Sequence, residues 1–303
     1  MNSSLRSVVL ALLGTLVFFL LIIFIGGAIN PSLKLDQTAL LRFVFVVIGL
    51  LIVFAVYWIT RENKMWEVGT REVVYMAIGA ALYAIFSYLF NGTVFVVPSL
   101  SQVSLRPAIA IPMFFGYAFG PVVGFFTGAV GNILGDFITG WGVYPAWDMG
   151  NGLMGLVPGL VMLFADKKRS LNFLTGLVAV LILIAAGLVF ANPQVVGPWT
   201  GEIEDFSFWA WAFIIGGVVV IAGRFVLERV SVDLAAVNLW GTLGIIIGIG
   251  FAAISDIWVN GYSFATAIIG EFAPAAGPNI LNSMILTPIL LAAYQAIQAR
   301  TGR

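Results

Sequence analysis

Residues Gly116 to Gly159 read GYAFGPVVGFFTGAVGNILGDFITGWGVYPAWDMGNGLMGLVPG. The stretch is apolar enough to lie in a lipid bilayer, and glycines three or four residues apart along its first half let helices pack with their backbones close together. It nevertheless carries polar side chains at Asn132, Asp136, Asp148 and Asn151. An acidic side chain at the centre of a bilayer costs about 2.5–3.5 kcal/mol on insertion scales. We therefore interpret the stretch as the wall of a small-molecule site in a membrane protein.

The composition excludes soluble proteins and most kinds of enzyme. Of the 303 residues, 61% are hydrophobic and only 9% are charged, whereas a soluble domain carries about 25% charged residues. Cysteine and histidine are absent, which removes disulfides, thiolate chemistry, imidazole bases and most transition-metal sites. Walker A, Gly-x-Ser-x-Gly and His-Glu-x-x-His sequences are absent too. We predict an all-α polytopic membrane protein that is not an enzyme and has no cofactor or metal.

Ten apolar segments are predicted to be membrane helices, because a span needs about 20 apolar residues. They are residues 8–29, 39–60, 73–90, 107–119, 121–139, 150–165, 171–191, 209–227, 235–255 and 276–298. The first is too long for the apolar core of a signal peptide and lacks a clear cleavage site, so we interpret it as a retained helix. Pro121 permits either a kinked helix or a tight hairpin across residues 107–139. The hairpin is favoured, because it keeps the later charges on consistent sides.

The positive charges favour one orientation. With the N-terminus in the cytoplasm, eleven Lys and Arg side chains fall inside and three outside, a strong positive-inside bias. We therefore predict a plasma-membrane protein whose two termini are both cytoplasmic. The outer cations are Lys34, Arg42 and Arg106, and the carboxylates at or near the outer side are Asp36, Asp136, Asp148, Glu202, Glu204, Asp205, Asp256 and Glu271. This acidic outer side mildly favours a cationic or neutral ligand over an anionic one.

The loop after Gly140 carries three aromatic residues beside the carboxylates. Trp and Tyr are typical of the membrane interface, which is one interpretation of the loop. The alternative is a site for a planar heteroaromatic ligand, held by stacking and by hydrogen bonds to carboxylates. A positively charged ring would gain cation–π attraction as well. The candidate substrate-binding residues are Asp136, Trp141, Tyr144, Trp147, Asp148, Asn151, Asn132, Arg106 and Asn282.

Arg106 and Asn282 lie outside that loop and have more than one interpretation. The Arg106 guanidinium can snorkel to the interface, pair with Asp136 or Asp148, or bind a ligand carboxylate. Asn282 shares a helix face with Asn279. These amides either bond across to a neighbouring helix or point into the cavity of the candidate site.

Segment 73–90 carries two overlapping pairs of alanines, Ala77 with Ala81 and Ala80 with Ala84. Small residues four apart lie on one helix face and let another helix approach closely. The pairs indicate either packing within the chain or a docking stripe for another subunit. Spacing alone does not choose between these interpretations.

The order of these features resembles the S component of energy-coupling factor (ECF) transporters, a family of membrane-embedded binding proteins for vitamins and related micronutrients. The shared order is an alanine-rich helix, the outer loop 91–105, a short helix ending in Phe-Gly-Pro121, a glycine ladder ending in Gly-Asp136, an aromatic loop and a helix ending before Asp166-Lys-Lys-Arg. The resemblance covers residues 71–169 well and 235–298 more loosely. It implies a six-helix core with the ligand near the outer face and the loop 91–105 as a lid.

The resemblance also implies partners. S components associate with a transmembrane T subunit and two ATPase subunits, which would supply the Walker motifs that this chain lacks. In the family an alanine pattern on the first core helix meets the T subunit; here it matches Ala77 and Ala81, with Ala80 and Ala84 as the adjoining pair. Transport in this family involves toppling of the whole S component in the membrane.

The chain departs from the family by its extra helices. Residues 1–62 form two helices before the core, residues 71–169 and 235–298 form the core, and residues 170–230 form an inserted helix pair. The extra helices would enlarge the part of the protein that must rotate in the membrane during toppling. Alternatively, they hold the protein upright or supply a permanent partner surface.

The leading functional interpretation is a substrate-capture subunit of an ATP-driven importer for a small planar micronutrient, a vitamin or its precursor. One alternative is a self-sufficient secondary transporter, coupled to protons through Asp136 and Asp256. Another is a structural assembly partner with no ligand. The sequence does not identify the ligand, because thiamin-like, pyrimidine, flavin and pterin rings fit these residues alike.

Overall fold

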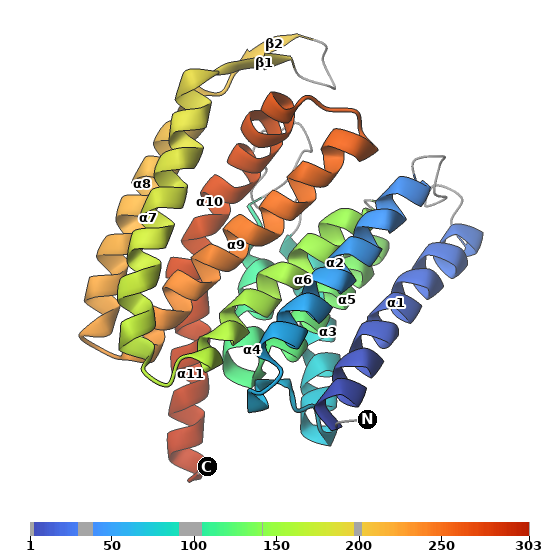
Figure 1. Ribbon diagram of the computed structural model, residues 1–303, viewed down its shortest axis with the longest axis vertical. Helices are drawn as coiled ribbons and strands as arrows, with labels where there is room; N and C mark the ends of the chain where they lie inside the picture. The colour runs from blue at the N-terminus through green and yellow to red at the C-terminus, as the bar shows by residue number, and fades with distance from the viewer. Residues whose placement is uncertain (1–2, 30–38, 91–104, 141, 197–201, 303) are drawn as a thin grey trace.

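The computed structural model describes residues 3–29, 39–90, 105–140, 142–196 and 202–302. The helices are α1 (Ser3–Ile29), α2 (Ala39–Thr60), α3 (Thr70–Phe90), α4 (Ala110–Phe119), α5 (Pro121–Thr139), α6 (Pro145–Gly159), α7 (Lys167–Ala191), α8 (Ser207–Glu228), α9 (Val232–Val259), α10 (Ala273–Met284) and α11 (Leu286–Thr301). Short 3-10 helices are η2 (Lys64–Trp66), η3 (Pro107–Ile109) and η4 (Leu160–Leu163), and η5 (Thr266–Phe272) is a π-helix. Strands β1 (Gln194–Val196) and β2 (Ile203–Asp205) pair antiparallel above α7 and α8 (Figure 1).

The predicted all-α polytopic fold is confirmed, and each of the ten predicted segments contains helix. Within the described ranges, eight helices are long and apolar enough to cross a membrane. The two shorter ones are η3 with α4 and α6 with η4. The last predicted segment starts earlier than expected, at Thr266, because the π-helix η5 leads directly into α10.

The predicted hairpin across residues 107–139 is also confirmed. Helix α4 ends at Phe119 and α5 begins at Pro121, with Gly120 between them at φ 106° and ψ 163°. Positive φ of this kind favours glycine, which has no Cβ to clash. A Cβ added at Gly124 would lie 2.5 Å from the Cα of Gly116. The two helices therefore turn back on one another with their backbones in contact.

Glycines hold α5, α6 and α9 together, as the glycine ladders predict. A Cβ on Gly124 of α5 would lie 2.1 Å from the backbone oxygen of Gly155 in α6. On its other side α6 meets α9, where a Cβ on Gly150 would lie 2.5 Å from the backbone oxygen of Gly248. Helix α6 is thus buried between two neighbours that approach to backbone contact, and it carries several candidate site residues into the interior.

The two additional helix pairs lie on opposite sides of this interior, with α1 and α2 on one side and α7 and α8 on the other (Figure 1). Helix α2 is seated on α6, because a Cβ on Gly49 would lie 2.1 Å from the side chain of Met149. Helix α8 contacts α9 through the Asn238 amide, which donates to the backbone oxygen of Val220 (3.0 Å). The division into a six-helix core and added pairs stays a prediction.

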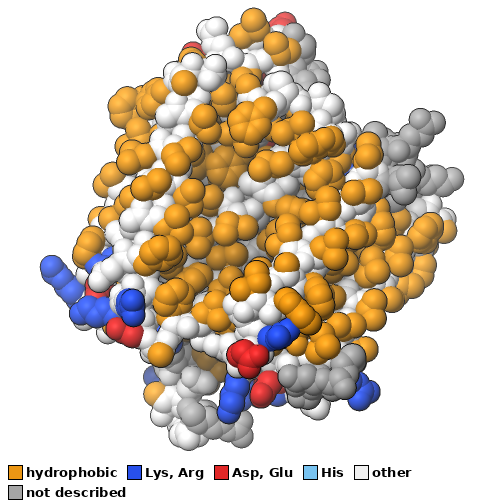
Figure 2. All heavy atoms as spheres, viewed as in Figure 1, with side chains coloured by type: hydrophobic (Ala, Val, Ile, Leu, Met, Phe, Trp, Pro, Cys, Tyr) orange, Lys and Arg blue, Asp and Glu red, His pale blue; other side chains and the backbone are white. Residues whose placement is uncertain are grey.

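One carboxylate joins four helices at the end of the molecule where α1 begins and α11 ends. Asp233 of α9 accepts hydrogen bonds from Tyr117 of α4 (2.8 Å), Lys167 of α7 (2.5 Å) and Gln295 of α11 (3.4 Å). On the face shown in Figure 2, Lys and Arg side chains gather at this same end. That is the distribution predicted for the cytoplasmic side, although the orientation itself stays a prediction.

Candidate functional site

The predicted amide and carboxylate residues meet around Asn132 of α5. Its Oδ1 accepts hydrogen bonds from the hydroxyl of Tyr83 in α3 (3.0 Å) and from the guanidinium of Arg106. Its Nδ2 donates to Asp148 Oδ1 of α6 (2.5 Å) and to Asp136 Oδ2 of α5 (3.2 Å). Both donors and both acceptor positions of this amide are therefore used. We call Tyr83, Arg106, Asn132, Asp136, Asp148 and Asn151 the polar cluster.

The polar cluster buries two carboxylates beside the guanidinium of the half-buried Arg106. Asp148 is fully buried and Asp136 nearly so. The charge of Arg106 acts on both, and the two carboxylates also lie against each other. Asp148 Oδ2 is buried without a hydrogen-bond donor among the described residues. A buried acceptor without a partner is costly, so this oxygen marks the place where a ligand donor would fit.

Arg106 is fixed to the last helices by its backbone. Its N–H donates to Asn279 Oδ1 (3.0 Å), and its carbonyl accepts from Asn282 Nδ2 (3.0 Å). Asn282 also donates to Asn279 Oδ1 (3.0 Å). The structure therefore gives Asn282 a positioning contact with Arg106. The guanidinium of Arg106 points inward and donates to Asn132, so Arg106 is not an isolated interfacial arginine.

The two aromatic candidates that the structure describes, Trp147 and Tyr144, have different surroundings. Trp147 of α6 donates its indole N–H to Asp256 Oδ2 of α9 (2.8 Å), so it lies between the polar cluster and α9. Tyr144 is 42% exposed and lies under the guanidinium of Arg42 from α2, 5.2 Å from ring centroid to Cζ. Among the described residues, its side chain makes no hydrogen bond to the polar cluster; only its backbone oxygen accepts from the N–H of Asp148 (2.9 Å). Trp141 lies outside the described residues, as does most of the proposed lid loop 91–105.

A second acidic pair, Asp256 of α9 and Glu271 of η5, lies beside Trp147. The two carboxylates are in contact, and both are buried. Tyr262, in the turn between α9 and η5, faces them: burial raises the pKa of its phenol, and the negative charges of Glu271 and Asp256 raise it further. The Arg42 guanidinium acts on the same groups from α2.

The two acidic regions each hold a pair of buried carboxylates. Within the described ranges no group of three or more His, Cys, Asp or Glu side chains is arranged to hold a metal ion. What the polar cluster offers is a set of buried acceptors, one guanidinium and an adjacent indole. Such a set fixes the orientation of a small polar ligand inside an apolar surround.

The alanine pairs on α3 have two different environments. Ala80 and Ala84 are almost fully buried, and they face α5, where a Cβ on Gly131 would lie 2.9 Å from the backbone oxygen of Ala80. These two alanines pack within the chain, and Ala80 also lines the groove described next; their part in a docking surface stays a prediction. Ala77 and Ala81 are exposed.

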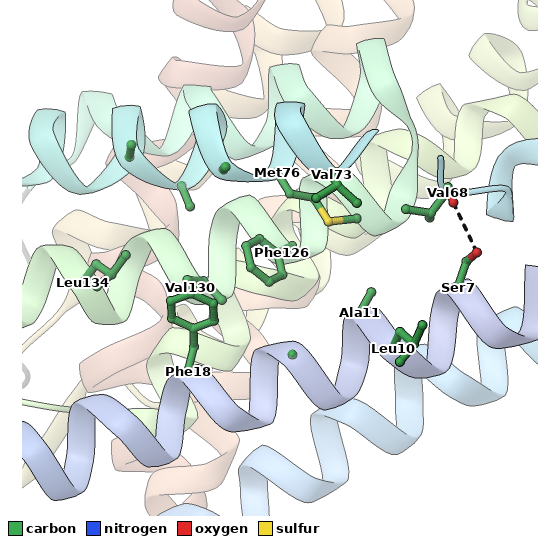
Figure 3. Close-up of a pocket in the computed structure, with 14 residues that line it drawn as sticks. Ser7, Leu10, Ala11, Phe18, Val68, Val73, Met76, Phe126, Val130 and Leu134 are labelled. Atoms are coloured by element: carbon green, nitrogen blue, oxygen red, sulfur yellow. Dashed lines mark hydrogen bonds between the residues drawn. The ribbon is translucent and has the colours of Figure 1, made fainter. Parts of the chain in front are cut away.

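Ala77 and Ala81 line an apolar groove of about 520 Å³ between α1, α3 and α5. Figure 3 shows its other walls, which include Leu10 and Phe18 of α1 and Phe126 of α5. The exposed alanine pair thus borders a hollow on the lipid-facing side of the molecule, where another apolar surface can approach.

Sequence reasoning missed three members of these sites as binding candidates. Tyr83 carries a buried hydroxyl, and a tyrosine amid small residues signals a hydroxyl in need of a partner. Glu271 was recognised only as an outer charge, although a glutamate in an apolar segment is a functional signal by default. Arg42 belongs to a helix that the family resemblance leaves out, so nothing in the sequence connected it to the site.

Comparison with known proteins relates the chain to one transporter family. Residues 67–198 match the family model described as ECF-type riboflavin transporter, S component. A UPF0397 protein of Vibrio atlanticus is 42% identical over 98 residues, which cover 32% of this chain and 52% of that protein. UPF0397 proteins of Aliivibrio salmonicida and Aliivibrio fischeri are 35% and 38% identical over 102 residues, covering 34% of this chain and 54% of each relative.

These matches confirm the resemblance to S components, and they are partial. The chain spans about half the length of the curated relatives it matches. No solved structure matches it. The family is a transporter component rather than an enzyme.

Proposed function

We propose that this chain, whose residues 67–198 match the S-component family model, is the substrate-capture subunit of an ATP-driven micronutrient importer. The observation that carries the proposal is the polar cluster. It gathers side chains from α3, α5, α6 and the residue before η3 in the interior of an apolar bundle. It also keeps one buried acceptor, Asp148 Oδ2, without a donor in the described chain.

The ligand is a small planar molecule bound near the outer membrane face. Ring N–H groups would donate to Asp148 and Asp136, the Arg106 guanidinium would donate to a ligand oxygen, and Trp147 would contact the ring. The matched family model is described as a riboflavin transporter component, and a flavin is one planar ligand of this kind. The acidic outer side supports a cationic or neutral ligand.

Mass spectrometry of small molecules that co-purify with the full chain tests this assignment. The wild type is expected to retain a planar ligand, and Asp148→Asn and Asp136→Asn are expected to lose it. Asp205→Asn is the matched control, because it removes an outer acidic charge from an exposed position away from the polar cluster. Hydrogen bonds from Ser207 lower the pKa of the Asp205 carboxyl in the wild type. Undiminished ligand occupancy in both cluster variants would refute the site.

The partners are a transmembrane T subunit and two ATPase subunits, with Ala77 and Ala81 as the docking surface. Support comes from their exposure beside the apolar groove, since small residues let a partner helix come close. Uptake into liposomes is expected only when the T subunit and ATPases are reconstituted with this chain and ATP is supplied.

A proton-coupled secondary transporter is the second candidate, favoured by one observation. Asp136 with Asp148 and Asp256 with Glu271 form two buried carboxylate pairs in apolar helices, and intramembrane carboxylates serve proton relays. Uptake by this chain alone, driven by a proton gradient, would favour this candidate and refute the capture subunit.

A further inference from the structure

We infer that the second acidic pair, Asp256 and Glu271, binds a positively charged nitrogen of the ligand, so the substrate is a cationic nitrogen heterocycle or amine. The inference rests on the proposed capture function and narrows its ligand class. It also assigns a role to two residues and a helix, α2, outside the stretch that matches the transporter family.

The first observation is a fully buried carboxylate without a partner. Glu271 is 0% exposed, and neither of its oxygens meets a hydrogen-bond donor among the described residues. Its nearest polar neighbour is the carboxylate of Asp256, which is itself an acceptor. Asp256 obtains one donor, the indole N–H of Trp147. Two acceptors in contact are satisfied only when a proton or a cation lies between them.

The second observation is the charge balance of the neighbourhood. The pair carries two negative charges when both groups are ionised. Helix α2 contributes Arg42, the turn after α9 contributes Tyr262, and α6 contributes Trp147. Arg42 supplies one positive charge, but its Nε is buried without a hydrogen-bond partner and its guanidinium stacks on Tyr144. One negative charge is left for a ligand to neutralise.

The third observation is the backbone that carries Glu271. Residues Thr266–Phe272 form a π-helix rather than an α-helix. A π-turn inserts an extra residue and redirects the side chains around it, and such turns are frequent at functional sites. Here the turn brings the Glu271 carboxylate against Asp256 instead of toward lipid.

Trp147 connects the acidic pair to the polar cluster. Its indole binds Asp256, while the next residue in α6, Asp148, binds Asn132. A ligand that reached from Asp148 to Asp256 would meet a carboxylate at each end and the Trp147 indole between them. Anionic ligands are disfavoured at both ends, and a cation beside the indole gains further attraction.

Equilibrium dialysis with the purified full chain tests the inference, with thiamin as the permanently cationic probe and riboflavin as the neutral one. The wild type is expected to bind thiamin at least about tenfold more tightly than riboflavin. Glu271→Gln, which keeps the shape and removes the charge, is expected to weaken thiamin binding about tenfold or more and to leave riboflavin binding unchanged. Asp205→Asn, the exposed control, is expected to change neither.

Thermal unfolding of the ligand-free protein separates binding from structure. Because Glu271→Gln removes an unpaired buried charge, its unfolding temperature is expected to stay equal or rise while thiamin affinity falls. Unchanged thiamin affinity would overturn the inference and indicate a shared proton, which the Gln amide replaces. Tighter binding of riboflavin, or binding of neither probe, would overturn the cationic ligand class.

The proposed function has a separate readout. If uptake requires the T subunit and ATPases while Glu271→Gln binds thiamin normally, the inference fails and the capture function stands. If the charge dependence holds but uptake follows a proton gradient without partners, the capture function fails and the cation site stands.

Discussion

Helices α1 and α5 are both apolar enough to cross a membrane, yet they occupy opposite environments. In its most apolar window α1 has a mean hydropathy of 3.2 and is 22% buried, whereas α5 has a mean hydropathy of 1.4 and is 72% buried. The less hydrophobic helix is therefore the more interior one. Other helices surround its glycines and polar side chains, so it does not need an apolar surface toward lipid. Between these two helices, the lower hydropathy belongs to the interior one.

The largest effect is expected from filling backbone contacts in α5. Gly124→Leu would drive a side chain into the backbone of Gly155 in α6, and overpacking of this kind costs about 3 kcal/mol or more. Gly14→Leu in α1 meets nothing within 4 Å and is expected to be neutral or stabilising by up to about 1 kcal/mol, since glycine disfavours helix. Thermal unfolding in detergent compares them, and equal shifts would contradict the contrast between the helices.

A smaller effect is expected from removing one polar side chain from each helix. Asn132→Leu leaves Tyr83, Asp136 and Asp148 short of a partner, at about 1–3 kcal/mol for each unsatisfied group, and it should abolish ligand retention. Thr15→Val in α1 removes only a bond to the backbone oxygen of Ala11. It is expected to change unfolding little, and a comparable loss in both variants would argue against a special interior of α5.

Helix α3 allows the buried and exposed environments to be compared through the hydroxyl groups of two tyrosines. Tyr83→Phe removes bonds to Asn132 (3.0 Å) and Asn151 (2.7 Å), so a loss of about 1 kcal/mol in unfolding free energy is expected, with ligand binding a few-fold weaker. Tyr88→Phe is the control, because Tyr88 is mostly exposed. Identical behaviour of both variants would show that the buried hydroxyl contributes nothing.

The smallest effect on stability is expected at the groove beside α1. Ala81→Trp adds bulk on an exposed position, so unfolding and ligand retention should stay unchanged while co-purification with the T subunit is lost. Ala55→Trp, on an exposed position of α2, should leave that assembly intact. Normal assembly of the Ala81 variant would remove this pair from the docking surface.

Much of the fold could be predicted because it depends on local sequence. Runs of apolar residues predict the helices, the sidedness of the later charges favours the hairpin at Pro121, and glycines at helical spacing indicate the close contact of α5 with α6. The same spacing places Asn132 and Asp136 one turn apart on one face of α5, which is where the structure has them.

The rest of the site depends on contacts that spacing does not encode. Arg106 and Asn279 are 173 residues apart in the chain, and only the packing of α10 against η3 brings them together. The π-helix that directs Glu271 inward has no simple sequence pattern. Tyr144 shows the converse, since this aromatic residue beside carboxylates in the sequence is 42% exposed and stacks against Arg42 of α2.

The contacts of Asp233 have a consequence for how this chain could be trimmed. Lys167, the first residue of α7, shares that carboxylate with Tyr117 and Gln295, so the start of this helix is tied to α4, α9 and α11. On the other side of the insertion, a Cβ on Gly223 of α8 would lie 2.5 Å from the side chain of Met284 in α10. Excising residues 170–230 to recover a minimal six-helix protein would therefore open a gap along α9 and α10. Helices α7 and α8 thus serve as structural supports for α9 and α10.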